Sequence, residues 1–201
     1  MEKKILDLFL FENQLKFNDI ERSLNIRSNK LAYHLKNLLI RGILKKEGEE
    51  YSLSDTSEYL IPYLSEKKAV LPVVLVHLGN KRSCFLYPRK KRPFKDKLSL
   101  PGGRLIIGES IPEGTKRIMG KKFHIESNFK KIHSISLEHV RKSGRIIHSF
   151  LLIFVSSSTK QKVQLTDIKK NKSKIIKSDY NLITNGLNKT AQINQLYTPV
   201  F

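Results

Sequence analysis

The sequence has 201 residues and a formal net charge of +20. Hydrophobic residues make up 39% of it, enough to bury a core, which excludes wholesale disorder. The single cysteine excludes an internal disulfide framework and a cysteine-based zinc site. No apolar run approaches the ~18 residues that a membrane span requires. The chain starts with an amphipathic pattern rather than a signal peptide, so we expect a cytoplasmic protein with no membrane partner.

The excess positive charge lies in the second part of the chain. Residues 1–67 carry 11 basic and 11 acidic residues and are therefore neutral. Residues 68–201 carry 27 basic and 7 acidic residues, which accounts for the whole net charge. This asymmetry predicts that an anionic ligand or a polyanion binds the second part. The alternative is an AT-rich genome that raises the lysine content, although such a bias would act on both parts.

Helical periodicity is typical of the first part of the chain. Apolar residues recur at helical spacing in three stretches between residues 5 and 39, and a hairpin is expected over residues 43–53. Three helices followed by a hairpin is the order of a winged helix. Residues 28–44 resemble the recognition helix and the start of the wing in ArsR-like winged-helix regulators. The resemblance predicts a winged helix-turn-helix domain over residues 1–67.

The third helix of this domain would carry the contacts with DNA. Its apolar face is expected to bury Leu31, Leu35 and Leu38, and its outer face presents residue types that suit base edges and phosphates in a major groove. The expected DNA-binding residues are Arg27, Ser28, Asn29, Lys30, Tyr33, His34 and Lys36. The neutral domain and the glutamates in its hairpin favour the alternative, a module for protein interaction or dimerisation. A homodimer is a further expectation.

The period of the hydrophobic pattern changes at residue 69. Apolar strand-like runs appear over residues 69–76, 84–87, 132–140 and 146–155, and they surround one helical stretch. Strands around a helix predict a mixed α/β domain over residues 68–201.

The segment from Pro101 to Ile125 carries the most specific motif. Ser110 and Glu113 have the spacing of a capping box, which predicts a helix that starts just after Ser110. Gly103, Glu109 and Arg117 then follow the spacing of the Nudix box, which this segment resembles. The resemblance implies a Nudix-like α/β/α sandwich with a mixed sheet, and hence an α+β protein of two domains. We expect Gly102, Gly103, Glu109 and Arg117 to be structural residues of this box, with Glu113 able to pair with Arg117 one turn on.

The segment departs from the Nudix box at the positions that hold magnesium or manganese in the family. Ile118, Lys121 and Lys122 stand where the family has glutamates. Hard divalent cations need anionic oxygen ligands, so we expect no metal cofactor and no catalytic residue. Lysines could instead neutralise a phosphate directly. The expected ligand-binding residues are Arg89, Lys90, Lys91, Arg92, Arg104, Lys121 and Lys122.

These patterns favour one function and leave two alternatives. The favoured hypothesis is a DNA-binding transcriptional regulator whose catalytically inactive Nudix-like domain binds a phosphorylated, nucleotide-type small molecule. The first alternative is an active Nudix hydrolase of nucleoside diphosphate derivatives, with magnesium at a site displaced to some of Glu109, Glu113, Glu126 and Glu138. The second alternative is a non-catalytic nucleic-acid-binding protein that grips the backbone with its basic surface.

Overall fold

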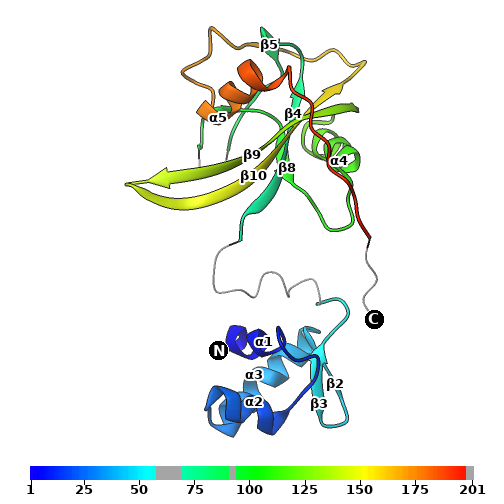
Figure 1. The fold of residues 1–201 in the computed structure, drawn as a ribbon, viewed down its shortest axis with the longest axis vertical. Coiled ribbons are helices and arrows are strands. Elements are labelled where there is room, and N and C mark those ends of the chain that lie inside the picture. Colours follow the sequence, from blue (N-terminus) through cyan, green and yellow to red (C-terminus); the bar gives the residue numbers. More distant parts are fainter. Residues whose placement is uncertain (58–68, 91–93, 198–201) are drawn as a thin grey trace. The chain divides into compact units, whose positions relative to one another are not determined.

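A computed structural model describes residues 1–57, 69–90 and 94–197. The chain divides into two compact units, Met1–Ala69 and Val70–Phe201, each with its own buried hydrophobic residues (Figure 1). Among the described residues, no helix combines the length and the apolar character needed to cross a bilayer.

In residues 1–57, the part of the first unit described up to its first gap, there are three helices and a small antiparallel sheet. The helices are α1 (Glu2–Leu8), α2 (Phe17–Leu24) and α3 (Ser28–Ile40). The sheet has the order β1-β3-β2, formed by β1 (Leu15–Lys16), β2 (Leu44–Glu47) and β3 (Glu50–Leu53). Gly42 and Gly48 both have positive φ, at the turn after α3 and at the tip of the β2–β3 hairpin, where a side chain would strain the backbone.

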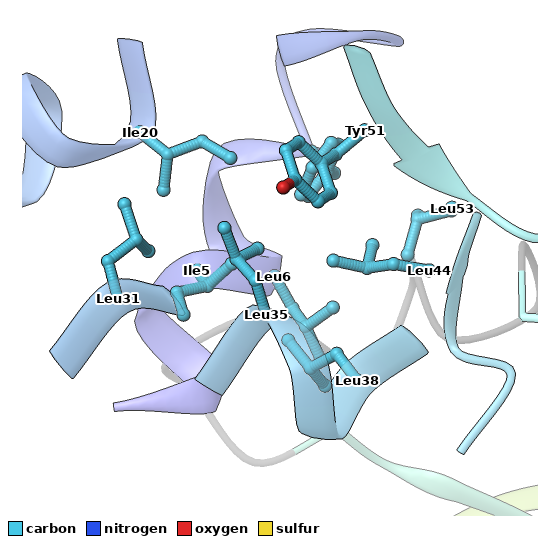
Figure 2. Packing of buried hydrophobic residues seen from close by; sticks show 10 residues of the cluster. Ile5, Leu6, Ile20, Leu31, Leu35, Leu38, Leu44, Tyr51 and Leu53 are labelled. Carbon is cyan, nitrogen blue, oxygen red and sulfur yellow. The ribbon is translucent and has the colours of Figure 1, made fainter. Parts of the chain in front are cut away.

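The buried face of α3 holds this unit together. Leu31, Leu35 and Leu38 are at most 1% exposed and pack with residues of α1, α2 and the sheet, as Figure 2 shows. Their spacing places them on one side of the helix, so the polar residues of α3 are left on the other side. The apolar face that the sequence predicted for this helix is confirmed.

The second unit is built on a mixed four-stranded sheet with the order β8-β4-β10-β9. Its strands are β4 (Leu71–Leu78), β8 (Gly102–Arg104), β9 (Asn128–Lys142) and β10 (Arg145–Ser158). β4 and β10 run parallel, and the other two pairs are antiparallel. Short strands form two further pairs, β5 (Ser83–Cys84) with β11 (Thr166–Asp167) and β6 (Tyr87–Pro88) with β7 (Leu98–Ser99). The helices are α4 (Ile111–Phe123) and α5 (Lys177–Asn181), the latter continued by a π-helical turn, η2 (Leu182–Gly186).

Both faces of the central strands are covered. Val74 and Val76 of β4 pack in one cluster with Ile118 of α4, whereas Leu75 packs in a second cluster with Ile183 of η2. Successive side chains of a strand point to opposite faces, so α4 and the α5–η2 segment lie on opposite sides of the sheet (Figure 1). Burial on both faces explains why β4 reads as a continuous apolar run in the sequence. The expected mixed sheet of an α+β fold is confirmed.

Candidate functional site

The N-terminus of α4 is fixed by local hydrogen bonds. The Ser110 hydroxyl accepts a bond from the Glu113 N–H at 3.3 Å, and the Glu113 carboxylate accepts one from the Ser110 N–H at 2.8 Å. This reciprocal pair is the capping box that the sequence predicted, and it is confirmed. The bonds from Ser110 hold the pKa of the Glu113 carboxyl below its ordinary value, so Glu113 is a weak base.

An ion pair ties the loop before α4 to the helix. Arg117 donates from Nε to Glu109 Oε1 at 2.5 Å and from Nη2 to Glu109 Oε2 at 2.9 Å. Arg117 also donates to the Arg104 carbonyl at 2.9 Å. The bonds from Arg117 lower the pKa of Glu109 and raise that of Arg117. Arg117 thus pairs with Glu109 and not with Glu113, since the capping box already holds the Glu113 carboxylate.

A cavity of about 620 Å³ opens along one side of α4. It is lined by residues of the preceding loop, of the helix and of the segment that follows the helix: Ile107, Gly108, Glu109, Glu113, Lys116, Arg117, Gly120, Lys121, Ile125 and Glu126. Three of its charged side chains are free of hydrogen bonds and ion pairs within the part of the chain that the structure describes, namely Lys116, Lys121 and Glu126. We call this the α4 cavity. Its free groups are two ammonium groups and one carboxylate.

The side chains of the two adjacent lysines of α4 lie in different places. Lys121 lines the α4 cavity, whereas the Lys122 ammonium donates to the Gly102 carbonyl of β8 at 2.5 Å. Ile118 is fully buried. Successive helix positions point about 100° apart, so neighbouring lysines do not share one site. Of the two lysines expected to bind ligand, Lys121 is thus the one beside the α4 cavity, and Lys122 lies against β8.

The other predicted ligand-binding residues lie elsewhere or outside the described residues. Lys91 and Arg92 lie outside them. Arg89 and Lys90 directly follow β6, and Arg104 is the last residue of β8. Of the predicted ligand-binding residues that the structure describes, Lys121 is the one that lines the α4 cavity.

The carboxylates near α4 do not fit a resident metal ion. Glu109 is engaged by Arg117, and Glu113 by Ser110. Among the described residues, no group of three or more His, Cys, Asp or Glu side chains is placed to hold a metal. Magnesium bound by a protein needs oxygen ligands that are free to coordinate it.

A buried carboxyl behind the site was missed by sequence reasoning. Asp179 of α5 is 4% exposed and accepts hydrogen bonds from the Leu100 N–H at 2.8 Å and the Ser99 hydroxyl at 3.0 Å. These bonds hold the segment that leads into Pro101-Gly102-Gly103. Burial raises the pKa of Asp179 to about 6. A single aspartate 79 residues from its partner gives no pattern that could have predicted this contact.

In the first unit, most of the predicted DNA-binding residues lie on the outer side of α3. Arg27, Ser28, Asn29, Lys30, Tyr33 and Lys36 are exposed. His34 is half-buried, with its Nδ1 4.0 Å from a carboxylate oxygen of Glu2. The Ser28 hydroxyl donates to the Glu21 carboxylate.

Solved structures show which fold a large part of the chain adopts. The chain is similar to a Nudix hydrolase from Nitrosomonas europaea, with a TM-score of 0.54 and 15% identity over 64% of this chain and 98% of that chain. It is also similar to a MutT protein from Methanosarcina mazei Go1, with a TM-score of 0.50 and 17% identity over 62% of this chain and 97% of that chain. The fold is Nudix-like. The matched share corresponds in length to Val70–Phe201. No protein-family model matches the sequence, and no curated protein matches it.

This likeness corrects the favoured hypothesis on function. A DNA-binding regulator with a catalytically inactive Nudix-like domain was expected, but the similar structure from Nitrosomonas europaea is a Nudix hydrolase and none of the likenesses supports DNA-binding regulation. The prediction is wrong on this comparison. The expected partners, namely DNA, a phosphorylated small molecule and a second copy of the chain, are not tested by it and stay predictions.

Proposed function

We propose that the Nudix-like unit is a hydrolase that cleaves the phosphoanhydride bond of a nucleoside diphosphate derivative in the α4 cavity. One observation carries the proposal. Three carboxylates that were candidates for a displaced site, Glu109, Glu113 and Glu126, line the same cavity, together with cationic side chains of α4. Glu138 of β9, the fourth candidate, does not line it. A cavity with both a free carboxylate and free cations has the groups that attack on a phosphoanhydride requires.

The cations of the cavity suit a diphosphate. Lys116 and Lys121 are five positions apart on α4 and both line the cavity without a hydrogen-bond or ion-pair partner in the described structure. Phosphoryl transfer depends mainly on positioning and on neutralising the charge of the phosphate oxygens. The two ammonium groups would bind those oxygens and stabilise the charge that develops on the leaving phosphate.

Glu126 is the candidate general base. Glu109 and Glu113 accept hydrogen bonds from Arg117 and Ser110, which lower both pKa values, so neither is suited to take up a proton. The Glu126 carboxylate has no such partner in the described structure. In the proposed step it takes a proton from a water molecule, the water oxygen forms a bond to one phosphorus, and the bond from that phosphorus to the bridging oxygen breaks. Two phosphate-bearing products leave.

The test is hydrolysis of a panel of nucleoside diphosphate derivatives by the full chain, both in EDTA and with added magnesium. We expect the wild type to hydrolyse at least one compound. In Glu126→Gln the rate of hydrolysis should fall about 100-fold, as is typical when a general base is lost. Glu138→Gln is the matched control, since Glu138 lies outside the cavity, and it should keep its activity. No turnover of any compound, or equal activity in the two variants, would overturn the proposal.

We also propose that the first unit is a winged helix. The order α1, α2, α3 and then the β2–β3 hairpin supports this, as does the pairing of β1 with β3 beside the hairpin. In this assignment the β2–β3 hairpin is the wing. Its test is nuclear magnetic resonance of the full chain, where cross-strand contacts are expected between Leu44 and Leu53, which are paired in register. Absence of that pairing would contradict the assignment.

A further inference from the structure

Three segments of the second unit, far apart in the sequence, meet on its surface. The loop between β4 and β5 contacts the segment that follows β11, because the Ile168 N–H donates to the Arg82 carbonyl at 2.9 Å. The turn before β7 contacts the same segment, because the Lys97 ammonium donates to the Ser173 carbonyl at 2.9 Å. We call the surface formed by residues 80–83, 94–97 and 166–177 the basic surface.

The charge of this surface is almost entirely of one sign. Its residues include nine lysines and arginines but two aspartates, and all nine cationic side chains are exposed. One of the aspartates, Asp167, accepts a hydrogen bond from the Lys170 N–H at 2.8 Å. The ammonium groups of Lys169, Lys170 and Lys174 have no hydrogen bond or ion pair within the described part of the chain. Clustered cations with so few carboxylates attract a polyanion, and phosphates are the usual partners of such groups.

The basic surface is separate from the α4 cavity. The buried residues of its segments, Ile168 and Ile175, pack in the cluster that contains Ile183 of η2, on the face of the sheet opposite α4. None of the nine cationic residues lines the α4 cavity. A ligand of this surface is therefore not the proposed substrate, and the inference does not rest on the proposed function.

One aromatic ring lies among these cations. Phe94 is 36% exposed and belongs to none of the buried clusters of the described structure. Its φ is +65°, in the left-handed region that a bulky residue rarely adopts. The Phe94 carbonyl accepts a hydrogen bond from the Lys97 N–H at 3.2 Å, and the Asp96 N–H donates to the Arg89 carbonyl at 2.8 Å. The turn is thus held by backbone hydrogen bonds, and it keeps the ring exposed despite the strain.

Lysines around an exposed aromatic ring are the combination that binds single strands of nucleic acid. The lysines neutralise the phosphates, and the ring stacks on a base that is not paired. A bilayer would find little to bury, because Phe94 is the one exposed large apolar side chain among the described residues of these three segments. We propose that the basic surface binds single-stranded nucleic acid, with its lysines on the phosphates and Phe94 stacked on a base.

The experiment measures binding of the full chain to labelled strands by fluorescence anisotropy. The probes are strands of 20 thymidine and 20 uridine nucleotides, longer than the about 4–16 nucleotides that one binding domain covers. They contain no phosphoanhydride bond, so the proposed hydrolysis does not act on them. We expect both to bind, with an affinity that falls steeply with salt. For about six neutralised phosphates, the slope of log affinity against log salt concentration should be about −4. The strand that binds more tightly identifies DNA or RNA as the partner.

The first variant removes three of the free cations. Lys169→Gln/Lys170→Gln/Lys174→Gln should lower the affinity for both strands at least tenfold and make the salt slope shallower by about 2. The matched control is Lys130→Gln/Lys142→Gln/Lys162→Gln, which removes the same charge from exposed positions of the second unit outside the basic surface. It should keep both the affinity and the slope.

The second variant tests the stacking. Phe94→Ala should lower the affinity for the single strands about tenfold and leave the salt slope unchanged, because no charge is removed. Its binding of inorganic polyphosphate, which has no bases, and of a 20-base-pair duplex, whose bases are stacked on one another, should be the same as that of the wild type. Phe94→Tyr should retain the affinity of the wild type for single strands.

Four results would overturn the inference. The first is no binding of either strand by the wild type at low salt. The second is equal affinity of the two lysine variants, which would place the contact outside the basic surface. The third is an unchanged affinity of Phe94→Ala for single strands, which would make the surface a general polyanion site. The fourth is binding to vesicles of phosphatidylserine and phosphatidylcholine that is lost in the first lysine variant while neither strand binds, which would assign the surface to an anionic membrane.

Discussion

Arg117 illustrates how one side chain organises the motif that the sequence analysis singled out. It makes two hydrogen bonds to Glu109 and one to the Arg104 carbonyl, so it joins α4, the loop before the helix and the end of β8. A guanidinium provides several donors in one plane, and a lysine in the same place could not make all three contacts. Because Arg117 holds Glu109 and Ser110 holds Glu113, Glu126 is the free carboxylate among the described residues that line the α4 cavity.

The buried carboxyl of Asp179 makes the stability of the fold depend on pH. Its pKa is raised from 3.8 to about 6, chiefly by burial, against the opposing effect of its hydrogen bonds with Leu100 and Ser99; Glu138 raises the pKa further and Arg89 lowers it. A folded-state pKa above the unfolded value means that the carboxyl stabilises the fold at low pH and that this stabilisation is lost as the pH rises through about 6.

The change that tests this is Asp179→Asn, which does not titrate and whose side-chain oxygen can still accept both bonds. Relative to the variant, the wild type should lose on the order of 2–3 kcal/mol of unfolding free energy between pH 4 and pH 8. Urea denaturation at both pH values measures the difference, and other titrating groups cancel because the two proteins share them. A difference that does not change with pH would contradict the raised pKa.

At the scale of elements, α4 contains two glycines in different surroundings. A Cβ added at Gly114 would lie 3.1 Å from Glu109 Oε2, and one added at Gly120 would have nothing within 4 Å. Glu109 cannot move away freely, because Arg117 holds both of its carboxylate oxygens. The close approach of the loop to the helix thus explains a glycine at position 114 but not at position 120.

The two alanine substitutions should have opposite effects on stability. Gly120→Ala should raise the free energy of unfolding by about 0.5–1 kcal/mol, because alanine loses less backbone entropy in a helix. Gly114→Ala gains the same entropic advantage, but its added methyl group displaces the Glu109 carboxylate. Overall it should lower the free energy of unfolding by about 1 kcal/mol. Chemical denaturation of the two variants provides the comparison. Equal stabilisation by both would show that the ion pair tolerates the added methyl group.

At the scale of the whole molecule, the chain has separate hydrophobic cores. The cluster of the first unit contains Leu35 and Leu38, and it has no residue in common with the clusters on the two faces of the second unit's sheet. A core substitution destabilises the cooperative unit to which the residue belongs. The free energy of unfolding falls by the transfer free energy of the removed atoms and by a further amount for the cavity left behind.

Leu35→Ala should therefore act on the first unit alone. Leu35 is 1% exposed, so we expect a loss of about 2–5 kcal/mol in the stability of residues 1–57. Hydrogen exchange measured by mass spectrometry should show faster exchange in α1 and α3 and unchanged protection in β4 and β10. The hydrolysis that we propose for the second unit should be unaffected. Faster exchange in β4 as well would show that the two units unfold together.

The sequence alone determined the features that depend on local spacing. The apolar face of α3, the capping box at Ser110 and the apolar runs of β4 and β10 all follow from residues a few positions apart, because helices and strands repeat at fixed periods. The resemblance of one short segment to the Nudix box also implied the Nudix-like fold, and the solved structures support it.

Only the tertiary structure decided which of these residues share a site. Arg117 pairs with Glu109 across a loop, and the adjacent Lys121 and Lys122 reach different places. Glu126, which precedes β9, accepts a hydrogen bond from Thr159, which follows β10. Asp179 reaches Leu100 across 79 residues. Such contacts depend on how the loops close and how the layers pack, and no short-range pattern in the sequence records those distances.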